Sequence, residues 1–328
     1  MITPSLIHDI ASLAAIEPEW RLLWERCPEA TPFQHPAWLL PWCRHFAPRL
    51  LSVIALRRGG RLVGLLPSFP RAVGDSAPRA LLGEGISDYL DALLDPAHLE
   101  ESLATLGAQL VDLGGAYDFH DLCASSPLLR LPSLRGYTDT TEATDVCPLL
   151  RLSNPPARLD SAVPRETLRN VRRARARAAA SGRLTHRLAD AGSRADLLEA
   201  LFALHGARWR LRGESGVLAQ GAIRAFHEEA STALLDAGML RLFGVFLDDA
   251  PIAALIALFA RGRAYLYLQG FDPALERLSP GLLATACAVE QACTEGASAV
   301  DFLRGRERYK HLWGARDELT YRRTLTPL

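Results

Sequence analysis

The 328-residue sequence is 49% hydrophobic and 23% charged, which is typical of folded domains and excludes an intrinsically disordered chain. Its 37 basic residues balance 37 acidic ones, so no net field attracts nucleic acid or an anionic membrane. Residues 1–20 lack the pattern of a signal peptide, and no apolar run reaches the roughly 18 residues of a membrane span. The six cysteines form no CxxC pair, so we expect free thiols, no metal site and a cytoplasmic location.

The first half of the chain shows a series of apolar runs separated by turn residues. It predicts strands at 51–57 and 62–69 joined at Gly59-Gly60, a strand at 89–94, the pair Asp95-Pro96, a helix ending at Gly114-Gly115, and a strand containing Asp118-Phe119. A segment rich in Pro and Ser follows at 150–164 and is typical of a linker.

An arginine-rich helix is predicted directly after the linker. Its basic residues are Arg165, Arg169, Arg172, Arg173, Arg175 and Arg177, with Glu166 as the one acid among them. We expect a solvated basic face here, or a surface that meets donor phosphates or an anionic acceptor. Without interleaved aromatic residues it does not predict sequence-specific nucleic-acid binding.

The second half repeats the series of the first. It predicts strands at 240–247 and 252–260 joined at Asp248-Asp249, a strand at 264–269, the pair Asp272-Pro273, a helix ending near Gly296, and a strand containing Asp301-Phe302. Several matched positions in one order indicate an internal duplication. We therefore predict a first domain at 1–150, a linker at 151–164 and a second domain at 165–328.

The two halves differ in the spacing between their paired aspartates. Asp95 precedes Asp118 by 23 residues, whereas Asp272 precedes Asp301 by 29. We expect the six additional residues around the segment 275–281, between strand and helix. Pro and Gly at a helix start leave backbone N–H groups accessible, and the helix N-terminus suits a phosphate. The alternative interpretation is a plain helix start with Ser279 as the N-cap.

Several short motifs carry a resemblance to a known family. In the second half they are Leu204-His205, Arg208-Trp209, Arg212-Gly213, the run from Tyr265 to Pro273, the run from Leu278 to Gly281, the run from Asp301 to Gly305, and Tyr309-Lys310; in the first half they are the run from Thr31 to Gln34, Trp38, and the run from Asp88 to Asp91. Through these residues the chain resembles the acetyltransferase domain of CelD-like and BioF-like proteins, which is related to the FemAB/FemX aminoacyltransferases of the GNAT superfamily.

The resemblance implies a fold of the α/β (α+β) class: tandem duplicated GNAT-like domains, each a mixed, mostly antiparallel sheet flanked by helices. It also implies that the strands at 264–269 and 299–303 splay apart to hold the pantetheine arm of acyl-CoA, the co-substrate. The acceptor would lie partly on the degenerate first domain. The donor-binding candidates are Gln269, Arg277, Leu278, Ser279, Pro280 and Gly281.

Lys310 is the candidate catalytic residue. It is the one lysine among the 37 basic residues, and Tyr309-Lys310 is similar to the Phe-Lys of FemX-type enzymes, whose lysine lies at the acyl-transfer site. The resemblance implies that its ammonium stabilises negative charge at the acyl carbonyl or leaving group. Asp88 is a second catalytic candidate, as a base near the acceptor. The acceptor-binding candidates are Tyr89, Asp91, Arg208, Trp209, Asp272 and Tyr309.

Three functions remain open from the sequence. The first is acyl transfer from acyl-CoA to an amine of a small molecule or a polysaccharide precursor. The second uses aminoacyl-tRNA as donor, with the arginine helix on the acceptor stem. The third is a non-catalytic accessory protein of polysaccharide biosynthesis or export. The sequence does not determine the oligomeric state.

Overall fold

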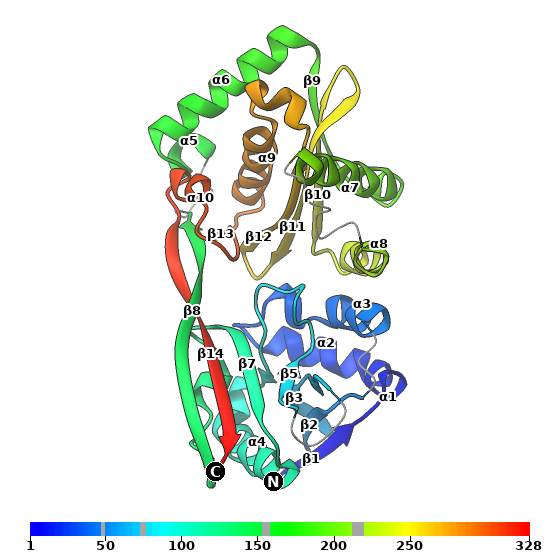
Figure 1. The fold of residues 1–328 in the computed structure, drawn as a ribbon, viewed down its shortest axis with the longest axis vertical. Helices are drawn as coiled ribbons and strands as arrows, with labels where there is room; N and C mark the ends of the chain where they lie inside the picture. Colours follow the sequence, from blue (N-terminus) through cyan, green and yellow to red (C-terminus); the bar gives the residue numbers. More distant parts are fainter. Residues whose placement is uncertain (47–49, 73–76, 153–157, 212–219) are drawn as a thin grey trace. The chain divides into compact units, whose positions relative to one another are not determined.

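The structure, a computed structural model, describes residues 1–46, 50–72, 77–152, 158–211 and 220–328 (Figure 1). The chain divides into two compact units: unit 1 is Met1–Val146 with Leu319–Leu328, and unit 2 is Cys147–Glu318. The division falls within two long strands, β8 (Tyr137–Arg151) and β14 (Arg316–Pro327). None of the described helices is long and apolar enough to cross a membrane.

Unit 1 contains a four-stranded antiparallel sheet and part of a second sheet. The first has the order β1-β2-β3-β6, from β1 (Ile2–Ile7), β2 (Val53–Arg58), β3 (Arg61–Leu66) and β6 (Leu93–Leu94). The second has the order β4-β5-β7-β14-β8, with β4 (Ser68–Pro70), β5 (Arg79–Leu81) and β7 (Tyr117–Cys123). The helices are α1 (Ile10–Ala15), α2 (Glu17–Arg26), α3 (Pro36–Phe46) and α4 (Leu99–Leu113), with 3₁₀ turns η1 (Pro32–Gln34), η2 (Pro96–His98) and η3 (Pro127–Arg130).

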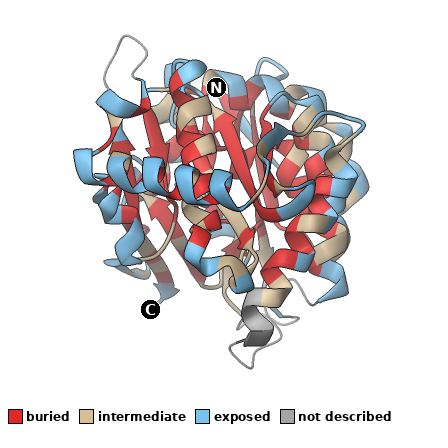
Figure 2. Ribbon diagram, turned by 90° about the horizontal axis from the view of Figure 1, so that it is seen from above, coloured by how far each residue is buried: buried red, intermediate tan, exposed pale blue. Residues whose placement is uncertain are grey.

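Unit 2 is one sheet flanked by helices. Its strand order is β8-β13-β12-β11-β10-β9, from β9 (Leu184–Leu188), β10 (Leu240–Leu247), β11 (Ala250–Ala260), β12 (Arg263–Phe271) and β13 (Ala299–Asp301). The helices are α5 (Leu159–Ala162), α6 (Arg165–Ser181), α7 (Arg194–Leu211), α8 (Gly221–Asp236), α9 (Pro280–Thr294) and α10 (Arg308–Leu312), with the 3₁₀ turn η5 (Pro273–Leu278). Figure 2 shows that the central strands are largely buried, whereas the helices bury one face and expose the other.

The packing of unit 2 follows from small residues at close contacts. Both α7 and α9 pack on β11 and β12, and α6 packs on α9. At Gly270 on β12, an added Cβ would lie 2.6 Å from the backbone nitrogen of His205 on α7. Glycine therefore lets α7 approach the strand directly. The core around α9 is rich in alanine, which allows the same closeness on that helix.

The duplicated series of elements is confirmed, with one strand much shorter than expected. The hairpins β2–β3 and β10–β11 occupy matching places, and α4 and α9 each have 15 residues. The strand expected at 89–94 was wrong in extent, since only Leu93–Leu94 forms β6. The backbone of the preceding residues bonds elsewhere: Leu90 donates to the carbonyl of Asp121, and the carbonyl of Tyr89 accepts from the Gln34 side chain.

Candidate functional site

The neighbouring strands β12 and β13 of unit 2 run parallel for three residue pairs only. The pairing ends at Tyr265 and Asp301, while β12 continues to Phe271. Ala264 and Tyr265 are buried, but the residues from Leu266 to Gln269 are partly exposed. The pairing therefore stops where β13 ends, and β12 continues beyond it. The edge of β12 from Leu266 to Gln269, beside the end of β13, is called the β12–β13 cleft below.

A β-bulge in β12 lies at this cleft. Ile256 of β11 pairs with Leu268 and the adjacent Ala257 pairs with Leu266, so Tyr267 is the extra residue of the bulge. A bulged residue leaves its backbone groups outside the regular hydrogen-bonding pattern and redirects its neighbours. The Tyr267 ring stacks on His227 of α8 at 5.8 Å, which fixes the ring against the helix.

The segment between β12 and α9 contains the donor-binding candidates. Asp272 caps η5 by accepting from the N–H of Ala274 at 2.9 Å. Leu278 is buried, and Ser279 adopts the left-handed conformation with φ 56°. Ser279 occupies the N-cap position of α9, but its side chain makes no capping hydrogen bond. The plain-cap interpretation is therefore wrong: a left-handed turn, with Pro280 behind it, starts the helix.

The first turn of α9 is chemically open to an anion. It contains no acidic residue, and the N–H groups of Gly281 and Leu282 have no acceptor within the helix. An added Cβ at Gly281 would lie 3.2 Å from the Phe271 ring, which would have to shift by a few tenths of an ångström to accommodate a side chain. A helix start of this kind favours negative charge through its N–H groups and dipole. Pro280 contributes no donor, which limits the number of such N–H groups.

Side chains from β12 and α6 hold this segment in place. The amide nitrogen of Gln269 donates to the carbonyl of Gly281 at 2.7 Å, which joins β12 to α9. Arg177 on α6 donates to the carbonyl of Arg277 at 3.0 Å and to the hydroxyl of Ser279 at 3.2 Å. Arg175 forms a two-point ion pair with Glu290 on α9, at 2.9 and 2.6 Å. Two arginines of the expected basic face thus bind the protein itself.

Lys310 lies inside unit 2 next to the end of β13. Its side chain is 3% exposed, and Nζ donates to the carbonyls of Leu303, Arg304 and Gly305 at 3.0, 2.6 and 3.3 Å. Glu307 lies 2.9 Å away as a counter-charge. Since these contacts use the protons of the ammonium, Lys310 would have to exchange one of them to reach an acyl group. These contacts indicate that Lys310 stabilises the turn formed by residues 303–305, which is called the 303–305 turn below.

The remaining candidates of unit 2 are more dispersed. Tyr309 is 46% exposed on α10, next to the buried Lys310. Asp272 is used as the cap of η5. The side chains of Arg208 and Trp209, and all of Arg212-Gly213, lie outside the described residues. Cys287, three residues before Glu290 on α9, lines a cavity of about 550 Å³ between α6, β9 and α9. Burial raises the pKa of its thiol to about 11, so it is a neutral group there.

In unit 1 the candidates Asp88, Tyr89 and Asp91 share one loop without regular secondary structure. Motif residues of the first half fix this loop: Gln34 donates to the carbonyl of Tyr89 at 3.0 Å, and the Trp38 indole donates to Ser87 at 2.9 Å. Asp88 is partly exposed and Tyr89 is 5% exposed. The loop is therefore rigidly supported, as residues that orient a ligand need to be.

Asp91 has the most unusual carboxyl group of this loop. Burial raises its pKa to about 7, although hydrogen bonds from the Ser126 hydroxyl and the Ala92 N–H, both at 2.8 Å, act in the opposite direction. A carboxyl with a pKa near neutrality can both donate and accept a proton, which is a property of general acid–base groups. The sequence alone identified Asp91 by its motif and gave no sign of this shift.

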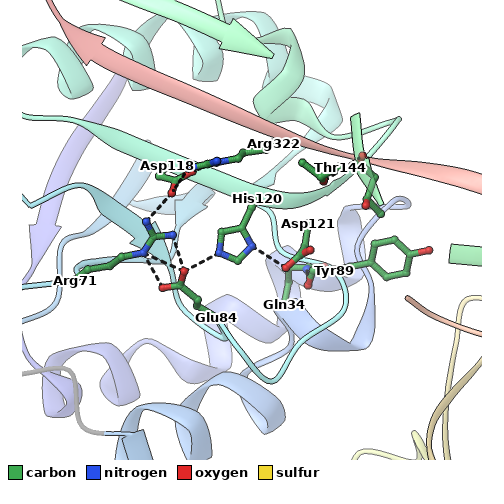
Figure 3. A network of polar contacts seen from close by, with 10 residues as sticks. Gln34, Arg71, Glu84, Tyr89, Asp118, His120, Asp121, Thr144 and Arg322 are labelled. Carbon is green, nitrogen blue, oxygen red and sulfur yellow. Dashed lines mark hydrogen bonds and ion pairs between the residues drawn. The ribbon is translucent and has the colours of Figure 1, made fainter. Parts of the chain in front are cut away.

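A chain of alternating charges, which the sequence did not predict, anchors the same loop (Figure 3). Glu84 accepts from Arg71 and lies 2.7 Å from Nε2 of His120, whose Nδ1 lies 2.7 Å from Asp121. Arg71 also pairs with Asp118 on β7, which accepts from Arg322 of β14 at 2.7 Å. The two carboxylates, Asp121 first, raise the pKa of His120 to about 9, so the ring is charged at neutral pH. In Figure 3 the Tyr89 ring points away from this chain of charges. No sequence spacing links these six residues, which come from four segments.

Comparison with known proteins supports the GNAT interpretation of unit 2. Residues 165–311 match the model of a family described as an acetyltransferase (GNAT) domain. A search of curated proteins finds no match. Among the described residues, no group of three or more His, Cys, Asp and Glu could hold a metal ion.

Solved structures with low sequence identity share the fold of the whole chain. FemX superposes with a TM-score of 0.69 at 13% identity, covering 95% of this chain and 96% of FemX. The C-terminal domain of a putative lysylphosphatidylglycerol synthetase from Agrobacterium fabrum has a TM-score of 0.60 at 12% identity, covering 95% and 91%. A tandem GNAT protein from the clavulanic acid biosynthesis pathway has a TM-score of 0.51 at 14% identity, covering 98% of both chains. With the matched elements of the two units, these likenesses identify the fold as two GNAT-like units in tandem.

Proposed function

We propose that the protein is an acyltransferase that moves an acyl group from acyl-CoA to an amine, with the donor in the β12–β13 cleft. The observation that carries the proposal is that β12 continues to Phe271 after its pairing with β13 ends at Tyr265 and Asp301, within the residues that match the GNAT domain. The cleft leaves a bulged, partly exposed strand edge beside a helix start that lacks acidic residues. An extended amide-containing chain ending in a diphosphate has the chemistry to occupy both features.

The chain's own residues would act mainly by positioning. The backbone edge of β12 from Leu266 to Gln269 would bind the amides of the donor arm, and the first turn of α9 would bind its diphosphate. A CoA thioester supplies an activated acyl carbon. The acceptor nitrogen bonds to that carbon while the carbon–sulfur bond breaks, and the proton of the amine passes to the sulfur leaving group. Holding the reactants in line contributes much of the rate in such a transfer.

Lys310 is proposed to act at this site through the 303–305 turn, because its ammonium is bonded to the carbonyls of that turn. A variant that loses the ammonium should lower kcat together with stability. A direct role toward the acyl group predicts a different result: a loss of kcat at conditions where the variant is fully folded. Asp88, Tyr89, Asp91, Arg208, Trp209 and Tyr309 stay predictions as acceptor contacts, to be tested by their effect on the KM of an amine.

A binding experiment with a charge-matched variant pair tests the proposed donor site. In unit 1 the first turn of α4 carries Glu100 and Glu101, which would repel a phosphate. Gly281→Glu places one such charge in α9, and Gly281→Gln has the same shape without the charge. We expect acetyl-CoA and CoA to raise the melting temperature of the native protein by several degrees, an effect that Gly281→Gln largely keeps and Gly281→Glu loses.

Two outcomes would overturn the proposal. One is no response of the native protein to acetyl-CoA, longer acyl-CoAs or CoA, whether or not charged tRNA binds. The other is equal CoA binding by the Glu and Gln variants, which would place the donor away from α9. Transfer of a radiolabelled acetyl group to a panel of amines then identifies the acceptor class.

A further inference from the structure

Helix α6 connects the two ends of the proposed donor site. Near its start, the Thr167 hydroxyl donates to the carbonyl of Leu312, the last residue of α10. Near its end, Arg177 holds the carbonyl of Arg277 and the hydroxyl of Ser279. Figure 1 shows α6 running between α10 and the turn that precedes α9. The helix therefore borders the region between the 303–305 turn and the start of α9, which is proposed to bind the diphosphate.

Two arginines close to the contacts of Arg177 have side chains that bind no other described residue. Arg173 precedes Arg177 by one helical turn, so the two lie on the same side of α6, with Cβ atoms about 6 Å apart. The side chains of Arg173 and Arg277 are exposed and form no ion pair or hydrogen bond with the described part of the chain. The buried stripe of α6, at Thr167, Val171, Ala174 and Ala178, faces away from this side. Arg277 thus belongs to the turn before α9, and Arg173 lies one helical turn from the residue that binds this turn.

The other arginines nearby are already neutralised or lie elsewhere. Arg175 is paired with Glu290, whose carboxylate raises the pKa of Arg175. Arg177 is bonded to the loop itself. Arg165 and Arg169 lie two or more turns before Arg177, about 12 Å along the axis for Arg169. In the described part of α6 and η5, Arg173 and Arg277 therefore combine a position near Arg177 or the α9 start with side chains that make no ion pair or hydrogen bond.

We propose that Arg173 and Arg277 bind a phosphate monoester that the acyl donor carries in addition to its diphosphate. Guanidinium groups bind phosphate oxygens by paired N–H donors, and two of them beside a helix N-terminus favour a dianion over a monoanion. The ribose 3′-phosphate of coenzyme A is such a group. This inference rests on the proposed function and adds a preference among donors: the site distinguishes CoA from dephospho-CoA, which lacks that phosphate and is otherwise the same molecule.

The test is a cycle of ligand and protein changes measured by calorimetric titration. We expect the native protein to bind CoA about tenfold more tightly than dephospho-CoA, which is about 1.4 kcal/mol. Arg173→Ala and Arg277→Ala should each weaken CoA binding, leave dephospho-CoA binding nearly unchanged, and so reduce the ratio toward one. Arg165→Ala, at the far end of the same helix, is the matched control and should keep the ratio. Since all three side chains are exposed, their melting temperatures should match that of the native protein.

The outcomes separate this inference from the proposed function. If CoA and dephospho-CoA bind the native protein equally well, or if the ratio persists in the Arg173→Ala, Arg277→Ala double variant, the phosphate subsite is wrong while the donor cleft stands. If neither ligand binds, the proposed function fails first. Titration with adenosine 3′,5′-bisphosphate and with inorganic phosphate shows whether the nucleotide context is needed, and binding of both with equal affinity would contradict a donor-specific subsite.

Discussion

The connection between strand and helix differs between the two units, although the elements on either side match. In each unit an aspartate opens the connection by capping a 3₁₀ turn: Asp95 accepts from Ala97 at 3.1 Å, and Asp272 accepts from Ala274 at 2.9 Å. In unit 1 the turn runs directly into α4 at Leu99, four positions after Asp95. In unit 2, α9 begins eight positions after Asp272. Four of the six additional residues therefore precede the helix, and two follow its start.

The chemistry of the helix start changes with the connection. The first turn of α4 contains Glu100 and Glu101, which neutralise the positive end of the helix from within the chain. The first turn of α9 contains no acid, and Ser279 in the left-handed conformation sets the helix start apart from η5. The comparison teaches that a duplicated fold can retain its helix in both copies while only one copy keeps a helix start suited to an external anion.

The ends of the last matched strands also differ. In unit 1, Asp121 of β7 has φ 57° and belongs to the chain of charges through His120. In unit 2, Leu303 after β13 has φ 57° and its carbonyl accepts from Lys310. A left-handed residue thus follows the Asp-Phe pair in both units. In unit 1 this residue is bonded to His120, which lies between two carboxylates. In unit 2 its carbonyl is bonded to the buried ammonium of Lys310.

The largest predicted effect is the loss of the ammonium in unit 2. Lys310→Met keeps the length of the side chain but leaves the carbonyls of Leu303, Arg304 and Gly305 without their donor. We expect a loss of about 3 kcal/mol in the free energy of unfolding, because buried acceptors lose their partners. Urea denaturation measures it, with the exposed neighbour variant Arg308→Met as the control. A loss below about 1 kcal/mol would mean that Lys310 does not support the turn.

The second prediction concerns the pH dependence of unit 1. The pKa of His120 is about 9 in the folded protein, above about 6.5 in the unfolded chain. A raised pKa means that the stabilisation is complete below pH 6.5 and is lost as the pH rises through 9. We expect the native protein to lose roughly 2 kcal/mol of stability between pH 6.5 and 9.5 from this group. His120→Gln should be less stable at pH 6.5 and show a flatter profile; an unchanged slope in this variant would remove His120 as its origin.

The pattern of apolar residues and the positions of turn residues predicted the repeated elements, because hairpins, Asp-Pro pairs and apolar strands are local features of the chain. They also located the additional turn before α9, since a length difference between two copies is visible without coordinates. The strand at 89–94 failed because its first residues bond to distant groups: the carbonyl of Tyr89 accepts from Gln34, and the N–H of Leu90 donates to the carbonyl of Asp121. Local sequence patterns do not show that the backbone groups of a segment form hydrogen bonds with distant residues in place of a neighbouring strand.

The charges of the site were harder to predict than its elements. Arg71, Glu84, His120 and Arg322 are separated by long stretches of sequence, and only the folded sheet brings them together. The raised pKa of Asp91 depends on burial, which a motif does not report. The single lysine was visible in the composition, but its bonds to three carbonyls were not. Sequence reasoning identified which residues to examine and left their contacts to the structure.

A third prediction compares two glycines, one from each unit. An added Cβ at Gly270 would lie 2.6 Å from the backbone nitrogen of His205 and 2.9 Å from the backbone oxygen of Leu201. At Gly64 the nearest atoms, at 2.8 and 2.9 Å, are methyl groups of Leu56 and Leu94. Methyl groups can move and a helix backbone cannot, so we expect Gly270→Ala to cost about 2 kcal/mol and Gly64→Ala about 1 kcal/mol. Gly221→Ala, with open space around it, is the neutral control. Equal costs at both positions would contradict direct contact of α7 with β12.

The smallest predicted effect tests the turn that distinguishes the units. Ser279 has φ 56° and ψ 52°, a conformation that costs a residue with a Cβ about 1 kcal/mol and costs glycine little. Ser279→Gly should therefore stabilise unit 2 by about 0.5 kcal/mol after the hydrogen bond from Arg177 is lost, whereas Ser279→Val should destabilise it by about 1 kcal/mol. Thermal unfolding of both variants measures the difference in sign. If valine is tolerated as well as glycine, the left-handed turn is not required, and α9 starts as plainly as α4 does.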